Sequence, residues 1–538
     1  MIRIDRRQLI ATAAFGTGGL LLPGGRLVAQ MLSAARGFTQ GVASGEPDSD
    51  SILLWTRFVG DGDSAHVRAE ISETADFARV VAADQMITGP WRDWTAKITL
   101  AGLQPGRRYF YRFAGPGGAM SPVGRTKTLP VGRTTTFNIG IFSCSNLPFG
   151  YFNAYAHAAA RDDLDVVYHL GDYFYEYRKG SYPSVAEGVR VAELQPESEL
   201  IHLADYRLRY ASYRSDPDLV AFHAAHPMIA SIDDHESAND SWEGGAENHQ
   251  PDKEGDWNAR KAAAVQAYRE WMPVDDEPWK TYQAGGLATL FKTDTRLIAR
   301  SKQREIGPSI ASGAAAFKAG AWIDPAETML GTTQENWLAH AMKASARAHA
   351  TWQVVGMGTI MGYAYTPEAA RGWLASDAPA RNRRYVDDGI AAAKAGLPNN
   401  FDNWGGYPAA RARFLHMAQA AGGSTILISG DSHNGWAFEL PGRGAPAAVE
   451  FAGHSVTSPG YESALVADPR IVAAGVAAAS PELKWCDTSR RGYMRLTLTP
   501  AAATNEWVFM ETIKARSTAT QPSHRMRVRP GRAKLETV

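Results

Sequence analysis

Short segments with alternating apolar and polar residues fill the chain from about Gly37 onward. Gly, Pro and Asp separate these segments, a pattern typical of short strands joined by turns. The clearest predicted strands cover residues 51–57, 66–71, 94–100 and 108–113. We therefore predict a small N-terminal β-sandwich domain over residues 37–130.

Beyond Pro130 the pattern changes to apolar, β-rich runs that alternate with Ala-rich helical stretches. Apolar residues recur at spacings of three and four in the predicted helices, which cover residues 150–161, 257–271, 334–348 and 408–421. Alternation of this kind is typical of an α/β domain, which we predict over residues 135–515. The basic tail over residues 514–534 is interpreted as a solvated terminus, with a surface strap as the alternative.

Four apolar runs in the second region each end in a cluster of polar residues. These runs cover residues 136–142, 164–170, 228–232 and 425–429, and the residues that follow them are Cys144, Asp172, Asp233-Asp-His-Glu236 and Gly430-Asp-Ser-His433. Open α/β sheets carry their sites at the carboxyl ends of the strands, because the loops leaving neighbouring strands converge there. The sequence therefore predicts one site built from four strand ends.

The composition indicates that any partner is bound at a local site. The 538 residues are 45% hydrophobic and 10% aromatic, which excludes a disordered or fibrous protein. Lys and Arg number 56, as do Asp and Glu, so no basic field indicates a nucleic-acid binding patch. The two cysteines, Cys144 and Cys486, are too few for a disulfide-rich scaffold, and the chain has no Gly-Lys dipeptide for a Walker A loop.

Residues 1–29 have the organisation of an export signal. Arg6 and Arg7 precede an apolar, Ala- and Gly-rich stretch, and Leu27-Val-Ala29 provides small residues for cleavage. The paired arginines resemble a twin-arginine signal, which implies the twin-arginine export machinery as a partner and a periplasmic or secreted location. A membrane anchor is the alternative, although the apolar run is shorter than the ~20 residues of a span. We expect no integral membrane span after cleavage.

The sequence Gly171-Asp-Tyr-Phe-Tyr-Glu176 offers ligands for a pair of metal ions. Asp172 supplies a carboxylate that can bridge two ions, and Tyr175 supplies a phenolate that suits a hard ion such as Fe³⁺. An equally open interpretation is that Tyr173 and Tyr175 are ordinary aromatic residues of the core. Cys144 is either a metal thiolate or a buried structural thiol, which is the commoner case.

Two further clusters carry groups of the same kind. Asp233 and Asp234 beside His235 would repel one another without a cation or strong hydrogen-bond donors, and an acidic surface turn is the alternative. Asp431 and His433 alternate, so both side chains face one side of an extended segment. Two ligands on one side at a strand end suit a metal ion.

Taken in order, these motifs resemble the binuclear metallophosphoesterases, which include the calcineurin-like and purple acid phosphatases. More closely, they are similar to the alkaline phosphatase D (PhoD-like) family from about Phe38 to about Tyr493. The motifs that carry the resemblance include Leu54-Trp-Thr-Arg57, Phe142-Ser-Cys-Ser-Asn146, His169-Leu-Gly-Asp-Tyr-Phe-Tyr-Glu-Tyr177, Asp233-Asp-His-Glu236, Asp294-Thr-Arg296, Trp404-Gly-Gly-Tyr407 and Gly430-Asp-Ser-His433.

This resemblance implies a fibronectin- or Ig-like β-sandwich followed by a calcineurin-like metallophosphatase α/β sandwich. It also implies a site that holds Fe³⁺ and Ca²⁺. The implied iron ligands are Cys144, Asp172, Tyr175 and His433, with Asp172 bridging to calcium. The implied calcium ligands are Asp234 and Asp431, with Asn239 as a further candidate whose register in its loop is open.

The implied activity is hydrolysis of phosphomonoesters or phosphodiesters by metal-activated water. His235 is expected near the leaving oxygen, where it protonates the alcohol or donates a hydrogen bond in the transition state. Arg296 either clamps a phosphate oxygen or belongs to a surface helix. The expected substrates are nucleotides, teichoic-acid-like polymers or phospholipid head groups.

Three other functions stay open. A phospholipase D-like diesterase would use the same scaffold. Gly430-Asp-Ser-His433 superficially resembles the signature of a serine esterase with Ser432 as nucleophile, although it lies late in the chain and is no Gly-x-Ser-x-Gly elbow. In a non-enzymatic alternative, the β-sandwich binds a component of the cell envelope and the second domain is a degenerate scaffold.

Overall fold

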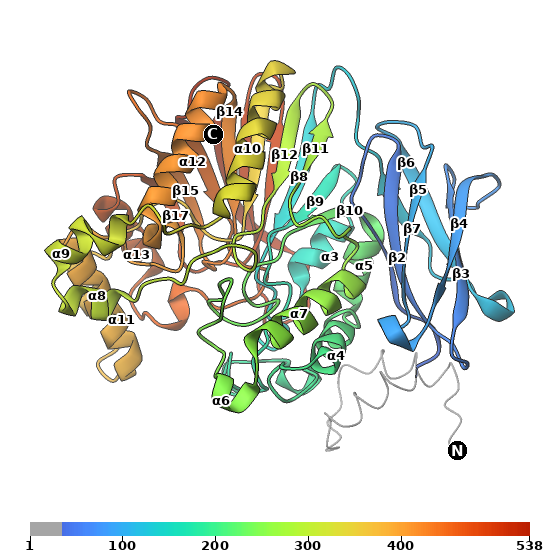
Figure 1. Ribbon diagram of the computed structural model, residues 1–538, viewed down its shortest axis with the longest axis horizontal. Helices are drawn as coiled ribbons and strands as arrows, with labels where there is room; N and C mark the ends of the chain where they lie inside the picture. The colour runs from blue at the N-terminus through green and yellow to red at the C-terminus, as the bar shows by residue number, and fades with distance from the viewer. Residues whose placement is uncertain (1–34) are drawn as a thin grey trace.

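The computed structural model describes residues 35–538, and the predicted signal over residues 1–29 lies outside them (Figure 1). A ten-stranded sheet has the spatial order β21 (Leu535–Thr537), β20 (Thr520–Val528), β19 (Ala503–Met510), β18 (Gly492–Leu498), β8 (Phe137–Phe142), β9 (Val166–His169), β10 (Pro227–Ala230), β1 (Gly37–Gly45), β2 (Ser51–Val59), β5 (Thr95–Ala101). A seven-stranded sheet has the order β11 (Lys280–Ala284), β12 (Ala288–Lys292), β13 (Trp352–Met357), β14 (Ser424–Ser429), β16 (Ala448–Ala452), β15 (Gly435–Leu440), β17 (Leu483–Asp487). A four-stranded sheet has the order β4 (Val80–Thr88), β3 (Ala65–Ser72), β6 (Arg108–Ala114), β7 (Gly124–Lys127).

The two large sheets pack face to face around an apolar core. Side chains from both sheets, such as Ile139 and Tyr168 from one and Val354 and Ile428 from the other, form this core. Strands β8, β9 and β10 are parallel, as are β12, β13, β14 and β16. Parallel strands covered on both faces are apolar along their whole length, which explains the continuous apolar runs in the sequence.

Helices cover the outer face of each large sheet. The helices on the ten-stranded sheet are α3 (Asn153–Ala159), α4 (Leu203–Tyr213), α5 (Pro217–Ala225) and α7 (Trp257–Trp271). The helices on the seven-stranded sheet are α10 (Gly331–Arg347), α11 (Ala380–Lys394), α12 (Pro408–Ala421) and α13 (Pro469–Ala479). The resulting order of helix, sheet, sheet and helix confirms the predicted α/β sandwich.

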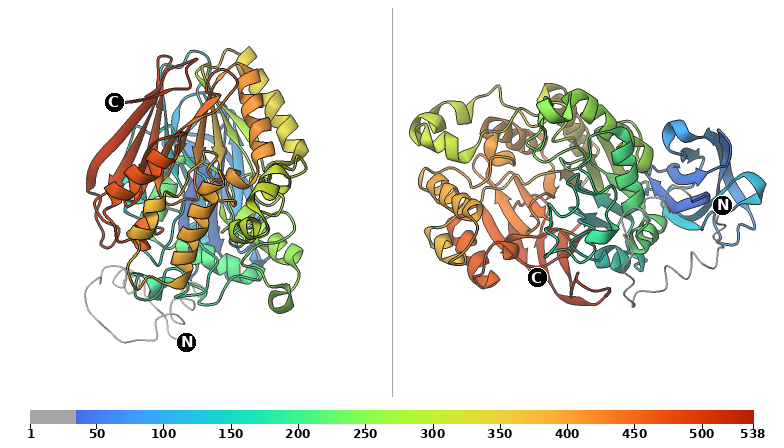
Figure 2. Two further views of the ribbon diagram at one scale, coloured as in Figure 1. Left: turned by 90° about the vertical axis from the view of Figure 1, so that its left-hand side faces the viewer. Right: turned by 90° about the horizontal axis from the view of Figure 1, so that it is seen from below.

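The N-terminal β-sandwich packs β1, β2 and β5 against the four-stranded sheet around its own apolar core. It shares a sheet with the rest of the molecule, because β1 pairs in parallel with β10 at Ser44–Pro227 and Gly45–Met228. The sandwich lies at one end of the molecule, and α11 with the short helices α8 (Ile306–Ala311) and α9 (Ala314–Ala319) lies at the other (Figures 1 and 2).

The sequence prediction of a solvated C-terminal tail is wrong. The basic tail contains β20, which pairs with β19 and β21 and buries Met526 and Val528. Its basic residues alternate with these apolar ones, so Arg525 pairs with Glu506 and Arg527 with Glu536 on the exposed face.

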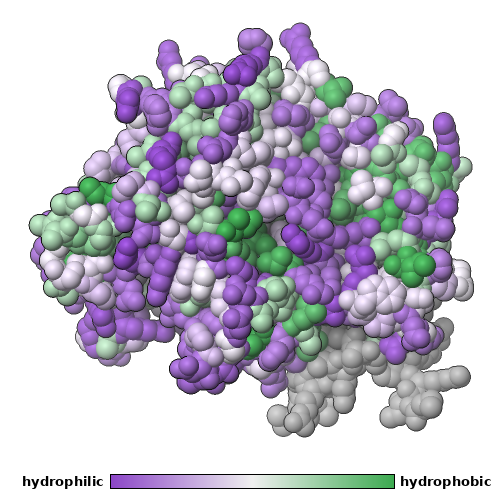
Figure 3. Space-filling model, viewed as in Figure 1, coloured by the Kyte–Doolittle hydropathy of each residue, from purple (hydrophilic) through white to green (hydrophobic). Residues whose placement is uncertain are grey.

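The surface of the molecule is mainly hydrophilic on the side shown in Figure 3, with hydrophobic residues gathered in separate patches. Within residues 35–538, none of the helices combines the length and the apolarity that crossing a membrane requires.

Candidate metal centre

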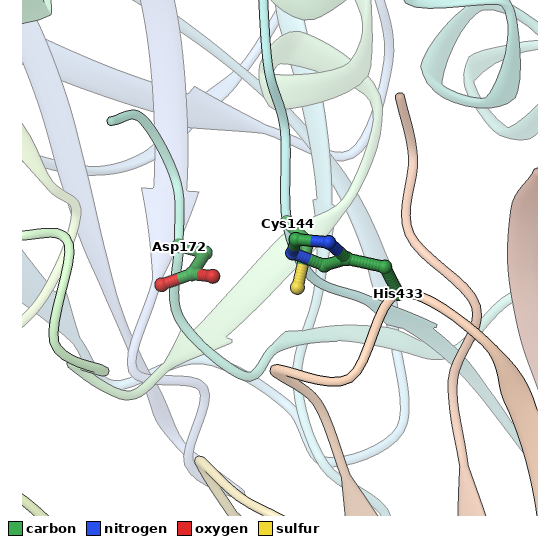
Figure 4. Close-up of side chains that lie close together, drawn as sticks. All are labelled: Cys144, Asp172 and His433. Atoms are coloured by element: carbon green, nitrogen blue, oxygen red, sulfur yellow. The ribbon is translucent and has the colours of Figure 1, made fainter. Parts of the chain in front are cut away.

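The polar clusters predicted from four strand ends meet where the two large sheets adjoin. Cys144 follows β8, Asp172 follows β9, and Asp234 follows β10 in the ten-stranded sheet. Asp431 and His433 follow β14 of the seven-stranded sheet. Figure 4 shows the side chains of Cys144, Asp172 and His433 close together, and their ligand atoms lie within 4.8 Å of one another.

Four groups of ligand residues overlap, because Asp172 belongs to three of them and Asp234 to three, and we refer to their members as the metal cluster. The groups are Cys144, Asp172 and His433; Asp172, Asp234 and His235; Asp172, Asp233, Asp234 and Asp431; and Asp234, Asp240 and Asp402. A thiolate, an imidazole and a carboxylate at one end, with carboxylates alone at the other, is a donor set for two kinds of ion. The soft and borderline donors suit a transition metal, and the oxygen donors suit a hard divalent cation.

Tyr175 completes the end of the cluster that contains sulfur and nitrogen. Its hydroxyl donates to Asp172 Oδ2 at 3.2 Å, and the phenol oxygen lies 3.0 Å from His433 Nε2. Ser458 donates to the same phenol oxygen at 2.6 Å. Burial raises the pKa of Tyr175 well above its usual value, so a phenolate at this position requires a cation beside it.

The His433 imidazole is held in the tautomer that a metal ligand needs. Its Nδ1–H donates to the carbonyl of Pro459 at 2.8 Å, which leaves the Nε2 lone pair facing Tyr175. Burial lowers the pKa of His433 to about 3, so the ring is neutral at neutral pH. A carbonyl on the second ring nitrogen is the usual support of a metal-bound histidine.

Five residues of the cluster have left-handed backbone angles that only glycine adopts without cost. The φ values are 61° at Cys144, 54° at Asp172, 51° at Asp240, 67° at Asp431 and 60° at His433. Such conformations cost about 1–3 kcal/mol each and persist where the surrounding structure fixes them, most often at functional sites. The strand ends are therefore strained in a way that brings their side chains together.

Gly171 shows why the strand ends approach so closely. Its φ is 110°, and a Cβ atom there would lie 2.4 Å from Cβ of Asp233. Glu236 then ties the two loops, because its carboxylate accepts the backbone N–H groups of Asp172, Tyr173 and Asp233 at 2.6–3.2 Å. Glycine at 171 is required both for the turn and for the contact.

The carboxylates of the cluster are buried with oxygens that have no hydrogen-bond partner. Within the described residues, Asp172 Oδ1, Asp233 Oδ2 and Asp234 Oδ1 are such atoms. Burial, reinforced by neighbouring carboxylates, raises the pKa values of Asp172 and Asp431 well above the usual range. A buried carboxylate without a partner is costly, and a bound cation removes that cost. The residues present therefore fit a metal ion.

A cleft of about 750 Å³ leads from the surface to the cluster, and Asp240, Asp402 and Asp431 form part of its wall. Segment 302–308 and residues of α11 provide the outer wall. The cleft is large enough for a small-molecule ester to reach the carboxylates.

Comparison with known proteins identifies the family. The family model described as PhoD-like phosphatase matches residues 139–507, and the model of its N-terminal domain matches residues 26–130. The chain belongs to the PhoD-like phosphatase family. Alkaline phosphatase D of Bacillus subtilis strain 168 is 31% identical over 491 residues, which cover 86% of this chain and 76% of the relative.

Solved structures agree with this membership. A structure of PhoD superposes with a TM-score of 0.78 at 28% identity, covering 94% of this chain and 92% of that one. A purple acid phosphatase from yellow lupin seeds, Lupinus luteus, gives a TM-score of 0.52 at 13% identity, covering 91% and 74% of the two chains, and so shows a shared fold. Phosphoester hydrolysis is the reaction class of a PhoD-like phosphatase, which confirms that part of the sequence prediction.

Arg296 lies in the PhoD-like site in a role that neither sequence interpretation contained. It is fully buried, donates from Nε to Asp233 at 2.5 Å, and donates from Nη1 to both oxygens of Asp402 at 2.8 Å. Its Nη2 has no hydrogen-bond partner and lies 3.6–3.7 Å from Asp234 and Asp431. The surface-helix interpretation is wrong, and the guanidinium serves here as a counter-charge to carboxylates.

Asn239, a ligand candidate implied by the resemblance, lies in the loop that follows His235. Its side-chain amide donates to Glu247 at 3.2 Å, whereas the next residue, Asp240, groups with Asp234 and Asp402. Asp240 is therefore a further carboxylate of this loop that lies in the cluster, and Asn239 as a ligand stays a prediction. Asp402 was missed as well, because it lies in a loop between α11 and α12 without a strand before it.

His235 lies against the cluster with a carboxylate partner that the sequence analysis missed. Its Nδ1–H donates to Glu176 at 2.6 Å, and Glu176 is also fixed by the backbone N–H of Asn239 and the side chain of Asn248. Burial opposes protonation, but Asp234, Asp172 and Glu176 outweigh it and raise the pKa of His235 well above its usual value. The sequence did contain a signal for Glu176, because Glu176 is the last residue of the motif that also contains Asp172.

The loop that carries Tyr175 and Glu176 is held by a buried arginine on α4. Arg209 donates to the carbonyls of Tyr175, Tyr177, Gln195 and Pro196, so its guanidinium is used entirely by backbone. This arginine joins the ligand loop to the segment before α4 and fixes the orientation of both side chains.

Ser432 does not have the contacts of an esterase nucleophile. Its hydroxyl accepts from the indole of Trp436 at 2.6 Å and donates to the carbonyl of Asn434 at 3.3 Å. In the described part of the chain no histidine hydrogen-bonds to it, so the serine-esterase alternative has no triad.

Proposed function

We propose that the chain hydrolyses phosphomonoesters and phosphodiesters at the metal cluster, with Fe³⁺ and Ca²⁺ as its ions. The observation that carries this proposal is the group of Cys144, Asp172 and His433 within 4.8 Å, next to buried carboxylate oxygens without partners. Such ions, when bound, supply Lewis acidity, an activated water and charge neutralisation for the phosphoryl oxygens.

The proposed ligands divide according to donor chemistry. Cys144, Tyr175 and His433 hold the iron, and Asp172 lies between the two positions. The carboxylates hold the calcium at the other end of the cluster, and they are Asp234, Asp240, Asp402 and Asp431. Burial raises the pKa of the Cys144 thiol, so binding of a cation there would be coupled to loss of its proton.

His235 is proposed to give a proton to the leaving alcohol. The carboxylates around it keep the ring protonated, and Glu176 fixes Nδ1 so that Nε2 is the atom available to the substrate. Arg296 keeps Asp233 and Asp402 in position and leaves Nη2 free to balance charge near Asp234 and Asp431. We further propose that residues 1–29 direct export by the twin-arginine route to the periplasm or the medium.

The direct test is elemental mass spectrometry on protein purified without tags or chelators, with p-nitrophenyl phosphate and its bis ester assayed on the same sample. The proposal expects iron and calcium to co-purify with an activity that a chelator removes. Folded protein that hydrolyses neither ester after loading with both ions would contradict it. Sensitivity to a serine-directed inhibitor in place of a chelator would favour the esterase.

A further inference from the structure

A small apolar pocket branches from the cleft that leads to the metal cluster. Its volume is about 100 Å³, and its walls come from the segment before α11, from α11 itself and from α13 with the loop before it. The largest apolar residues that line it are Trp373, Leu374, Val386, Tyr461, Leu465 and Val476. We refer to it as the side pocket.

The side pocket and the cleft share two wall residues, Tyr385 and Asn399. The Tyr385 side chain is 54% exposed and stands at the boundary between the two spaces. Asp431 of the metal cluster lies in the wall of the same cleft. The back of the pocket is also close to the ligands in space, because the backbone N–H of Tyr461 donates to the side chain of Asn434, the neighbour of His433, at 3.3 Å.

The walls of the side pocket are preformed. Trp373, Val386 and Val476 are buried in the core that covers the seven-stranded sheet, and the carbonyl of Trp373 accepts the backbone N–H of Val466 at 2.8 Å. Concave apolar spaces next to a few polar groups are the usual form of a specificity pocket, since the polar groups orient the ligand and the apolar walls select it.

We infer that the side pocket receives an apolar ester substituent of the substrate while the phosphoryl group lies at the metal cluster. This inference rests on the proposed function and specifies its substrate class. The pocket is smaller than the cavity of about 150 Å³ that accepts benzene in another protein, so it suits a short alkyl chain or part of an aryl ring. A complete acyl chain of a membrane lipid exceeds it.

The test uses methyl-, butyl- and octylphosphonate as probes against the metal-loaded protein. These compounds carry the phosphoryl oxygens and the alkyl group but no ester bond to hydrolyse. Binding is measured by calorimetry and by competition with p-nitrophenyl phosphate. Each buried methylene is worth roughly fourfold in affinity, so butylphosphonate is expected to bind on the order of 50-fold more tightly than methylphosphonate. Octylphosphonate is expected to add much less per methylene, because the pocket is then full.

Two pocket variants and one control make the test specific. Ala464→Phe fills the pocket and Leu465→Gln makes its wall polar, and both residues line it. Each variant is expected to reduce the butyl-to-methyl ratio below about threefold without changing the affinity for methylphosphonate. Ser463→Phe adds the same ring at an exposed neighbouring position and is expected to keep the ratio.

The outcomes separate this inference from the function beneath it. Methylphosphonate that competes while butylphosphonate gains nothing would overturn the side pocket and leave the phosphoesterase intact. A ratio that survives in both pocket variants, or affinity that rises evenly up to the octyl chain, would also overturn it. Failure of every phosphonate to bind, together with no ester hydrolysis, would remove the proposed function itself.

Discussion

Two regions of this molecule bury carboxylates in opposite ways. At the junction between the N-terminal sandwich and the rest of the chain, Glu46 lies in a cluster with Lys280, Tyr282 and Lys292. One oxygen of Glu46 accepts from Lys292 at 3.1 Å, and the other accepts from Lys280 at 3.1 Å and Tyr282 at 2.7 Å. At the metal cluster, Asp172, Asp233 and Asp234 each keep a buried oxygen that has no hydrogen-bond partner among residues 35–538.

Two buried histidines also differ in whether carboxylates surround the ring. His226, just before β10, hydrogen-bonds only to the carbonyl of Ala158, at 2.8 Å, and burial lowers its pKa to about 4. His235, just after β10, faces three carboxylates and remains charged. The difference teaches that buried charges with partners belong to the fold itself, whereas buried carboxylate oxygens without partners mark the candidate site for a cation.

The strongest way to break this contrast is Asp172→Asn. We expect a loss of phosphatase activity of about 1,000-fold or more, equal to about 4 kcal/mol of transition-state stabilisation, measured with p-nitrophenyl phosphate. In chelator-treated protein the same change is expected to raise the melting temperature, because asparagine replaces a carboxyl group whose ionised form is disfavoured by burial and by neighbouring carboxylates. A lower melting temperature without metal would show that Asp172 is a structural carboxylate like Glu46.

Glu46→Gln tests the junction, where the buried carboxylate has partners and its loss is expected to destabilise the fold. Breaking this ion pair leaves the buried Lys292 with weaker compensation, and we expect the free energy of unfolding in urea to fall by about 3 kcal/mol. Activity per folded molecule should not change. Glu506→Gln, which removes a pair with the exposed Arg525, is the control and should cost less than about 1 kcal/mol. Equal losses in the two variants would contradict a special role for the junction.

His226→Gln tests the neutral histidine through pH. The pKa of His226 falls from 6.5 in the unfolded chain to about 4 in the fold, so the unfolded state binds more protons between these values and stability falls as pH decreases through them. Relative to the variant, the wild-type protein should lose about 2–3 kcal/mol between pH 7 and pH 4.5. Parallel stability curves for the two proteins would show that His226 is not the titrating group.

Glu176→Gln is expected to have the smallest effect of the four, on His235 alone. Loss of the partner carboxylate should lower kcat about 10–100-fold and shift the pH dependence of kcat, because one of the charges that hold the His235 proton is gone. Iron content should stay the same. Glu270→Gln, a similarly buried carboxylate that pairs with Arg207 on another face, is the matched control and should leave kcat unchanged.

Local patterns in the sequence were enough to identify the elements that lead to the site and the core of the site. The predicted helices over residues 257–271 and 408–421 are α7 and α12, since apolar spacing and the flanking Asp256 and Gly422 act within a few residues. The four strand ends were also readable, because each buried run is continuous and its polar cluster follows directly. The order of the motifs along the chain was sufficient to predict the family.

Only the tertiary structure decided which distant residues complete these elements. Asp402 joins Asp234 and Asp240 across separate loops, and Arg296 is held between Asp233 and Asp402, more than a hundred residues from the latter. The sequence also did not show that β1 pairs with β10 in one sheet, or that β20 pairs with β19. Periodicity records which side of an element is buried, whereas charge partners and edge pairings depend on what the completed fold places beside it.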